Sequence, residues 1–508
     1  MRTHSHVIEA TGEGWRSLIQ VMRALIRTAI VGVVLGACST STSSPSETVP
    51  SGNQSIEWSP CSDDAEEVLL CGTLEVPFDY EKPEVGVFTL NLVKHPATQA
   101  SKRIGSMLVN PGGPGFGGTA IAENASAYLS SRLLEVFDVV GWDPRGTGDS
   151  TPAVNCIDEY DEYFAIDPTP ANAEEKQRVI DASMNFADVC EEKNTEILPY
   201  ISTNNSARDM DQIRQALGEE KITYFGFSYG SELGGTWATM FPDTVRAAVL
   251  DGATDPTADY VQSGLNQAEG FENEFSKFLE RCATDSLCAF HNNGNSRQAF
   301  IELMQSVDAR PIEVSPDRAP VNQSVLQTAV AMAMYSSAMW PQLEEALASA
   351  QAGDGEGILT LYDDYYQRGV DGNYGNELEA FLAISCLDDP GPQSVAEADS
   401  HTPKFQEVAP LLYPGFVGGY VCVFWPAQTD RRIEITGVGA GPILVIGVTG
   451  DAATPLASTR KMAGALQDGR LIVVDANRHT GYGENACVTD AADDYLISTQ
   501  IDFSEKLC

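Results

Sequence analysis

The sequence is poor in positive charge. It has 31 lysines and arginines against 72 aspartates and glutamates, which gives a formal net charge of −41. Such a balance repels the phosphates of nucleic acid, so we exclude DNA and RNA as partners. A well-hydrated soluble surface is the simplest interpretation, and the charge is also compatible with cationic ligands.

Patterns that bind metals or nucleotides are missing as well. The sequence holds no C-x-x-C pair and no cysteine and histidine cluster at metal-ligand spacing, so we expect no structural zinc. The glycine-rich stretch Asn110-Pro111-Gly112-Gly113-Pro114-Gly115 is not followed by Lys-Ser or Lys-Thr, which argues against a phosphate-binding loop. We therefore expect neither a metal nor a cofactor.

A permanent membrane span is not expected near the amino terminus. The apolar run from Thr28 to Ala37 is too short to cross a bilayer, and it follows Arg23 and Arg27. A short basic region, a short apolar region and small residues before a cleavage point are typical of a secretory signal. Because Cys38 comes next, the segment resembles the lipobox of bacterial lipoproteins. We predict that residues 1–38 are a lipoprotein signal with Cys38 lipidated; a plain signal peptide with an incidental cysteine is the alternative.

The next segment and the cysteines fit an exported protein. Residues 39–55 are rich in serine, threonine and proline without an apolar period, which predicts a flexible tether to the cell envelope. Of the 11 cysteines, ten are left when Cys38 is set aside, and an even number in an exported chain favours disulfides. Connectivity cannot be deduced from sequence, but short separations favour Cys61–Cys71, Cys156–Cys190, Cys282–Cys288, Cys386–Cys422 and Cys487–Cys508.

The body of the chain has three parts. Residues 56–255 alternate strand and helix patterns with near-continuous apolar strands, which predicts a mostly parallel sheet covered by helices on both faces. Residues 256–436 are dominated by helical patterns, and strands return in residues 437–508. We therefore predict an α/β core in two parts, with a helical cap inserted before the last sheet strands to shape a pocket.

A candidate nucleophile lies at the end of an apolar strand, in Gly226-Phe227-Ser228-Tyr229-Gly230. In the G-x-S-x-G pattern a serine occupies a strained turn between a strand and a helix, and the glycines allow the two to approach closely. The alternative is a glycine-rich turn with an ordinary serine. Because a serine hydroxyl is a weak nucleophile at neutral pH, Ser228 would need a base and an orienting carboxylate.

The base and the acid follow from the order Ser, Asp or Glu, His that α/β hydrolases show. His479 is the histidine that fits this order near the end of the chain, so we assign it as the general base. Asp451 follows an apolar strand and is our candidate acid. Asp251 and Asp475 are its rivals, but we interpret Asp251 as a cap on the start of the helical insertion and Asp475 as the end of its strand.

A tetrahedral oxyanion needs two backbone N–H donors. Tyr229, the residue after the nucleophile, should supply one of them. The glycine-rich stretch after an earlier strand should supply the other, with Gly113 as first choice and Gly112 as second.

Five motifs together carry a resemblance to a known family. They are Asn110–Gly115, Asp143-Pro144-Arg145-Gly146-Thr147-Gly148, Gly226–Gly230, Asp451-Ala452-Ala453-Thr454-Pro455 and His479-Thr480. In this order they resemble the tripeptidyl aminopeptidase-like enzymes, secreted actinobacterial relatives of prolyl aminopeptidases, and above all the lipoprotein members represented by a mycobacterial cell-envelope serine hydrolase. The resemblance implies an α/β-hydrolase fold with a helical cap and cleavage of short peptides from the amino end through an acyl-enzyme on Ser228. Some members of the family process proteins or esters.

An aminopeptidase also needs an anion to hold the substrate ammonium. The cap acids Glu377, Glu379, Asp388 and Asp389 are the candidates, although each could be ordinary surface. Two functions on the same triad stay open, a carboxylesterase or lipase and a protein-processing endopeptidase, because a triad fixes the reaction type and not the substrate. A tethered binding lipoprotein on an inactive hydrolase fold is the third alternative.

Overall fold

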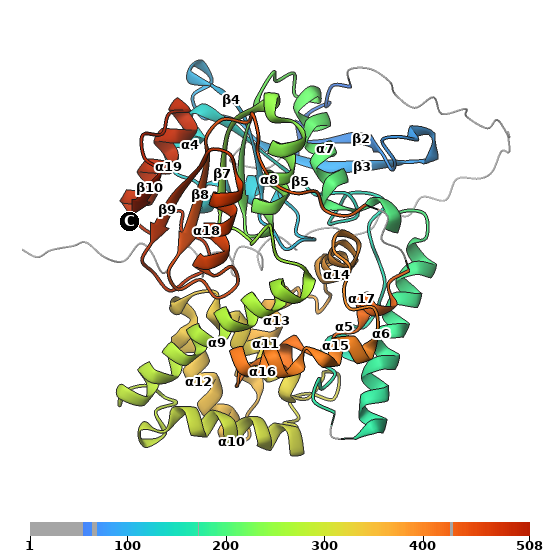
Figure 1. The fold of residues 1–508 in the computed structure, drawn as a ribbon, viewed down its shortest axis with the longest axis vertical. Coiled ribbons are helices and arrows are strands. Elements are labelled where there is room, and N and C mark those ends of the chain that lie inside the picture. Colours follow the sequence, from blue (N-terminus) through green and yellow to red (C-terminus); the bar gives the residue numbers. More distant parts are fainter. Residues whose placement is uncertain (1–53, 63–68, 171, 427–429) are drawn as a thin grey trace, which may run out of the picture.

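The core is built on one twisted sheet. The computed structural model describes residues 54–62, 69–170, 172–426 and 430–508, so the signal region with Cys38 and most of the tether lie outside the described residues. Within these ranges ten strands form a sheet in the order β1-β2-β3-β5-β4-β6-β7-β8-β9-β10 (Figure 1). The contacts between β1, β2, β3 and β5 are antiparallel and the other contacts are parallel. The strands are β1 (Ser59–Pro60), β2 (Leu70–Pro77), β3 (Val87–His95), β4 (Gly105–Asn110), β5 (Phe137–Trp142), β6 (Ile222–Phe227), β7 (Val245–Asp251), β8 (Ile443–Val448), β9 (Gly469–Val474) and β10 (Glu505–Leu507).

Helices cover both faces of this sheet. Side chains along a strand alternate between the two faces, so Tyr224 and Phe225 of β6 belong to different hydrophobic clusters. Tyr224 packs on the side of α7 (Thr203–Ala216), α8 (Tyr229–Met240) and α18 (Leu456–Ala465). Phe225 packs on the side of α2 (Thr119–Glu123), α3 (Ala125–Tyr128), α4 (Ser131–Val136) and α19 (Ala486–Ser498). The predicted mostly parallel sheet with two covered faces is confirmed.

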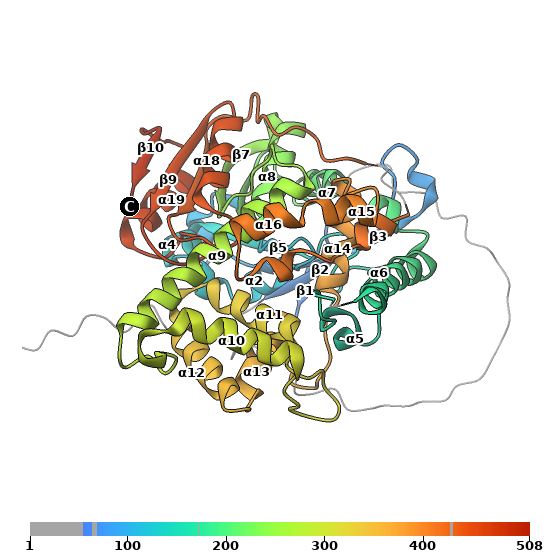
Figure 2. The ribbon, with the colours of Figure 1, turned by 60° about the horizontal axis from the view of Figure 1, so that its bottom comes forward.

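A helical cap leaves the sheet after β7 and returns to it at β8. β7 and β8 are hydrogen-bonded neighbours, so the cap is an insertion between adjacent strands. Its helices are α9 (Tyr260–Thr284), α10 (Ser296–Ala309), α11 (Gln323–Met334), α12 (Trp340–Gln351), α13 (Glu356–Tyr365), α14 (Glu377–Asp388), α15 (Val395–Ser400), α16 (Thr402–Val408) and α17 (Val421–Phe424). In Figures 1 and 2, α9 to α13 lie together on one side of the core, over their own cluster of buried aromatic and aliphatic side chains. Most buried residues of α14 and α17 belong instead to a hydrophobic cluster of the core. The division at residues 256 and 436 stays a prediction.

A second helical segment joins the cap from the first half of the chain. It consists of α5 (Tyr160–Phe164) and α6 (Ala173–Asn194), and α6 runs beside the cap at the right of Figure 1. The ring of Tyr160 stacks on Tyr374 at 4.4 Å between centroids. The sequence analysis places this segment in the α/β core, within residues 56–255. Its polar helical pattern does not indicate whether it packs on the sheet or on the cap.

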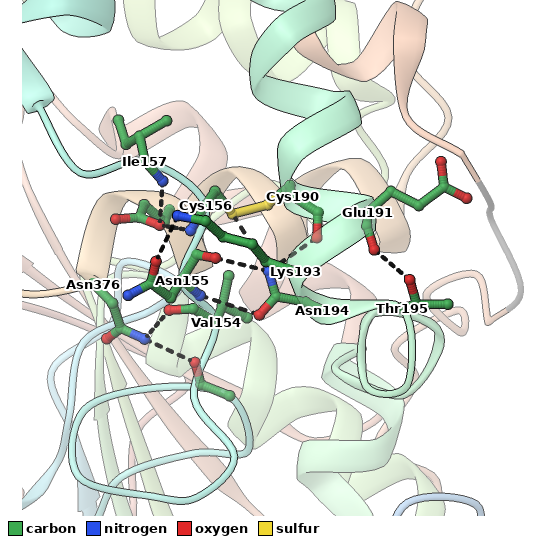
Figure 3. The surroundings of a disulfide bond; sticks show 12 residues. Val154, Asn155, Cys156, Ile157, Cys190, Glu191, Lys193, Asn194, Thr195 and Asn376 are labelled. Carbon is green, nitrogen blue, oxygen red and sulfur yellow. Dashed lines mark hydrogen bonds between the residues drawn. A yellow bond between two sulfur atoms is a disulfide. The ribbon is translucent and has the colours of Figure 1, made fainter.

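The described residues contain five disulfides, and they join the five cysteine pairs favoured from sequence. Cys156–Cys190 ties the loop after β5 to α6, and Figure 3 shows Asn376, the residue before α14, bonded to Val154 of the same loop. Cys386–Cys422 joins α14 to α17. Along the part of the chain that the structure describes, no helix combines the length and the hydropathy of a transmembrane span.

Candidate active site

Ser228 occupies a strained turn between β6 and α8. Its backbone angles are φ 55° and ψ −126°, in a region that side-chain-bearing residues seldom adopt. The two glycines of the motif allow the turn to close: a Cβ on Gly226 would lie 2.3 Å from the carbonyl oxygen of Gly230, and one on Gly230 would lie 2.8 Å from that of Asn110. The strained turn expected from the motif is confirmed.

His479 and Asp451 form a buried pair in two loops at the carboxyl ends of β9 and β8. Both carboxylate oxygens of Asp451 lie 2.9 Å from Nδ1 of His479. Thr454 donates its hydroxyl to one of these oxygens at 2.9 Å and its backbone N–H to the other at 2.8 Å. With all these donors directed at it, the carboxylate is held in place and orients the imidazole so that Nε2 faces away from the pair.

Ser228 and His479 both border the end of β7. The backbone N–H of Ser228 donates to the carbonyl of Asp251 at 2.8 Å, and a Cβ on the following Gly252 would lie 3.1 Å from Cε1 of His479. In the described part of the chain, the buried Nε2 of His479 has no hydrogen-bond partner. It is therefore available to take a proton from a hydroxyl.

The glycine-rich loop after β4 lies against the nucleophile. A Cβ on Gly112 would be 2.8 Å from Cβ of Ser228 and 3.0 Å from the backbone nitrogen of Tyr229. The N–H of Gly112 already donates to the side-chain oxygen of Asn110 at 3.0 Å. Gly113 is thus the better candidate of the two for an oxyanion donor beside Tyr229.

Comparison with known proteins identifies the family. A sequence model described as alpha/beta hydrolase fold matches residues 105–486. The chain belongs to the α/β-hydrolase family.

Its relatives narrow the class of enzyme. Serine protease Hip1 of Mycobacterium tuberculosis (strain ATCC 25618 / H37Rv) is 33% identical over 88% of this chain and 90% of its own. Carboxylesterase B of the same strain is 34% identical over 87% of each chain. Tripeptidyl aminopeptidase of Streptomyces lividans is 29% identical over 89% of this chain and 86% of its own. The resemblance inferred from the five motifs is confirmed, and this α/β hydrolase is a serine hydrolase.

Two of the four cap acids of the hydrolase are engaged in buried hydrogen bonds. Glu379 accepts the backbone N–H groups of Cys156 and Ile157, and Asp388 accepts the backbone N–H of Thr203 at 2.8 Å and its hydroxyl at 2.5 Å. Burial raises the pKa of each carboxyl to about 7. Figure 3 shows the disulfide and the loop through Ile157 against which α14 packs.

The other two acids are more open. Asp389 lies 3.4 Å from the guanidinium of Arg432. Glu377 is the first residue of α14 and lines a cavity of about 1420 Å³. The cavity is also lined by Pro111, within the glycine-rich loop Asn110–Gly115 (the oxyanion loop), and by Phe116, which follows that loop. Within the described ranges no cationic side chain pairs with Glu377, and burial raises the pKa of its carboxyl. The cavity borders the oxyanion loop and not Ser228 itself, which is absent from its described lining.

The sequence interpretation of Asp251 was wrong. Its carboxylate does not bind the start of the helical insertion. It accepts the backbone N–H groups of Gly481 at 2.7 Å and Tyr482 at 2.8 Å. This fully buried side chain holds the loop that begins at His479. Since the partners are distant in sequence, no local pattern could have revealed the contact. Asp475, the other rival, accepts the hydroxyl of Thr449 at 2.9 Å, whereas the described carboxylate bound to His479 is that of Asp451.

Proposed function

We propose that this serine hydrolase releases short peptides from the amino end of its substrates through an acyl-enzyme on Ser228. The observation that carries the proposal is the buried Asp451–His479 pair beside a serine in a strained turn. Similarity to a tripeptidyl aminopeptidase supports the peptide substrate. Peptides that carry a positive charge at the free amino end also suit the strongly acidic chain.

The reaction needs one proton carrier. His479 takes the proton of Ser228 Oγ on Nε2 as the oxygen bonds to the carbonyl carbon, and the oxyanion accepts hydrogen bonds from the N–H groups of Tyr229 and Gly113. The scissile C–N bond then breaks and the imidazolium gives its proton to the leaving amine. Water repeats the cycle: it loses a proton to His479 and attacks the acyl group. The ester bond then breaks, the imidazolium returns its proton to Ser228 Oγ, and the peptide acid is released. Asp451 holds the proton on Nδ1 throughout.

Glu377 is the cap acid that best suits a substrate ammonium. The carboxylates of Glu379 and Asp388 already accept internal hydrogen bonds, and Asp389 has Arg432 beside it. Glu377 instead lines the cavity next to the oxyanion loop, and its backbone oxygen would lie 2.3 Å from a Cβ on Gly115 of that loop. A partly desolvated carboxylate that is not already paired with a cation binds an ammonium more strongly than one in bulk water.

The proposal includes the location of the enzyme. A lipid on Cys38 and the tether of residues 39–55 would hold the body near the outer face of a membrane, which it contacts through the anchor alone. The five disulfides support this placement, because such bonds persist in oxidising compartments. Metabolic labelling with a palmitate analogue, in the intact protein and in Cys38→Ala, tests it: labelling must depend on Cys38.

A substrate comparison tests the activity. A form lacking residues 1–38 and its Ser228→Ala variant are given a tripeptide amide reporter with a free amino terminus, its N-acetylated twin and a short-chain nitrophenyl ester. We expect hydrolysis of the free tripeptide, little of the acetylated twin and none by Ser228→Ala. Equal cleavage of the acetylated twin would contradict the aminopeptidase and favour an endopeptidase. Absence of fluorophosphonate labelling would indicate an inactive binding protein.

The ammonium site has its own control. Glu377→Gln should lower kcat/KM for the free tripeptide about 10- to 100-fold, since a hydrogen bond between charged groups contributes about 1.5–3 kcal/mol. Glu356→Gln is the matched control, because Glu356 is also the first residue of a cap helix but is exposed. An equal effect of the two substitutions would exclude Glu377 as the anchor.

The second candidate function is a carboxylesterase, favoured by the similarity to carboxylesterase B. The same triad would cleave an ester by the same steps. Turnover of the ester alone, lost in Ser228→Ala, would select it.

A further inference from the structure

A pair of backbone hydrogen bonds joins the cap to the loop that carries His479. The N–H of His479 donates to the carbonyl of Tyr335 at 2.8 Å, and the N–H of Ser337 donates to the carbonyl of Asn477 at 2.9 Å. The two bonds flank an antiparallel bridge between the residues in the middle of each segment. Segment 335–337 lies between α11 and α12, whereas segment 477–479 follows β9. The histidine backbone is therefore paired with the cap and not with the sheet.

Side chains of the cap contact the same loop. The ring of Tyr335 lies 5.4 Å from the imidazole of His479 and nearly perpendicular to it, at 87°. From α9, Lys277 donates to the side-chain oxygen of Asn477 at 3.2 Å. The cap thus holds the histidine loop through two separate helical elements.

The backbone just after His479 needs such support. Thr480 has φ +66°, which is unusual for a β-branched residue. Backbone in such a region persists when the surrounding structure fixes it on both sides. On the far side the N–H of Gly481 is bonded to Asp251, and on the near side the N–H of His479 is bonded to Tyr335. Loss of the near bonds would let the loop relax at Thr480 and rotate the imidazole.

We propose that cap segment 335–337 is a positioning element for His479, so that the general base is assembled by cap and core together. The inference rests on the catalytic role of His479 proposed above. A shift of about 1 Å in a reacting group can lower a rate a hundredfold, so the register of this bridge sets the efficiency of the enzyme. This corner of the cap should accordingly stay docked on the histidine loop during turnover.

Ser337→Pro removes one of the two hydrogen bonds with little other change. Ser337 is exposed and is the first residue of the 3-10 helix η6 (Ser337–Met339), a position where proline is well tolerated. Ser336 has φ −159° and ψ 133°, the extended conformation that a residue before proline prefers. The released carbonyl belongs to Asn477, which is exposed and can bind water. Ser337→Ala keeps the N–H and is the matched control.

The measurement is kcat per active site titrated with a fluorophosphonate, together with KM, the pH profile of kcat/KM and the melting temperature. We expect Ser337→Pro to lower kcat about tenfold or more and to change the pH profile, with KM within about twofold of that of Ser337→Ala. A merely structural role would lower the melting temperature and leave kcat per active site and the pH profile unchanged. A folded Ser337→Pro enzyme with wild-type kcat and pH profile would overturn the proposal.

Hydrogen exchange on the unmodified enzyme covers the case in which Ser337→Pro does not fold. The N–H groups of Ser337 and His479 should both be protected in the substrate-free protein; exchange of both at the rate of free amides would refute the bridge. Ser228→Ala, assayed in parallel, keeps the two proposals distinguishable. An active Ser228→Ala enzyme would refute the triad, whereas failure of the bridge alone leaves activity dependent on Ser228.

Discussion

The carboxylate of Asp251 accepts the backbone N–H of Gly481 at 2.7 Å, two residues beyond His479. The same residue accepts the backbone N–H of Ser228 through its carbonyl. One residue at the end of β7 thus fixes the backbone of the candidate nucleophile and the loop of the candidate base. The relative position of these two groups depends on it.

Asp251→Asn should lower activity with the triad side chains intact. An amide has one acceptor oxygen in place of two, so its NH₂ group would face one of the two N–H donors. We expect kcat to fall about 10- to 100-fold, as a misplaced base would produce. Asp475→Asn, on an exposed residue near the same loop, should retain kcat. Equal values for the two variants would contradict the positioning role of Asp251.

Gly112→Ala should abolish most activity. Its Cβ would lie 2.7 Å from the carbonyl oxygen of Phe227 and 2.8 Å from Cβ of Ser228, and Gly112 has φ +107°. We expect kcat to fall about 100-fold or more, because the oxyanion loop must move away. Gly353→Ala is the control for backbone strain alone. Gly353 also has a positive φ, +89°, but a Cβ built on it would have no atom within 4 Å. If Gly353→Ala loses as much activity, global destabilisation is the cause and the explanation by contact is wrong.

Thr454→Val removes the hydroxyl donor to Asp451 and keeps the shape of the side chain. Loss of one hydrogen bond to a buried carboxylate should lower kcat about tenfold, whereas Asp451→Asn should lower it about 10⁴-fold. Thr449→Val, on an exposed residue just before the same loop, is the control. The measurement is kcat of these variants and the wild type on one substrate under steady-state conditions. A wild-type kcat in Thr454→Val would show that Thr454 only shapes the turn and does not support Asp451.

Asp388 should make stability fall as the pH rises. Burial raises the pKa of its carboxyl from 3.8 to about 7 in the folded protein. Between these values the folded state binds a proton that the unfolded state does not, so the free energy of unfolding decreases with pH across this window. Asp388→Asn stays neutral, and its melting temperature should decline less than that of the wild type between pH 5 and pH 8, by about 2 °C or more. If the melting temperatures of the wild type and of Asp388→Asn decline equally from pH 5 to pH 8, the raised pKa is refuted.

Local patterns were enough to predict the strands, the strained turn at Ser228 and the five disulfides. Apolar runs, paired glycines and short cysteine separations each act over a few tens of residues or fewer. The role of Asp251 and the surroundings of Glu379 and Asp388 could not be predicted in this way. Their partners come from segments far away in the chain, such as Thr203 for Asp388 and Cys156 for Glu379. Such contacts are fixed by tertiary packing and leave no mark in the local sequence.

The position of the cap between neighbouring strands also affects how the protein folds during its synthesis. β7 cannot pair with β8 until residues 252–442 have been synthesised, so one edge of the unfinished sheet stays open during that time. Asp451 and His479 both follow β8, whereas Ser228 precedes the cap. A growing chain therefore contains the candidate nucleophile before the candidate base and acid have been made. The base and the acid of the proposed triad are thus supplied only by the last part of the chain, after the whole cap has been made.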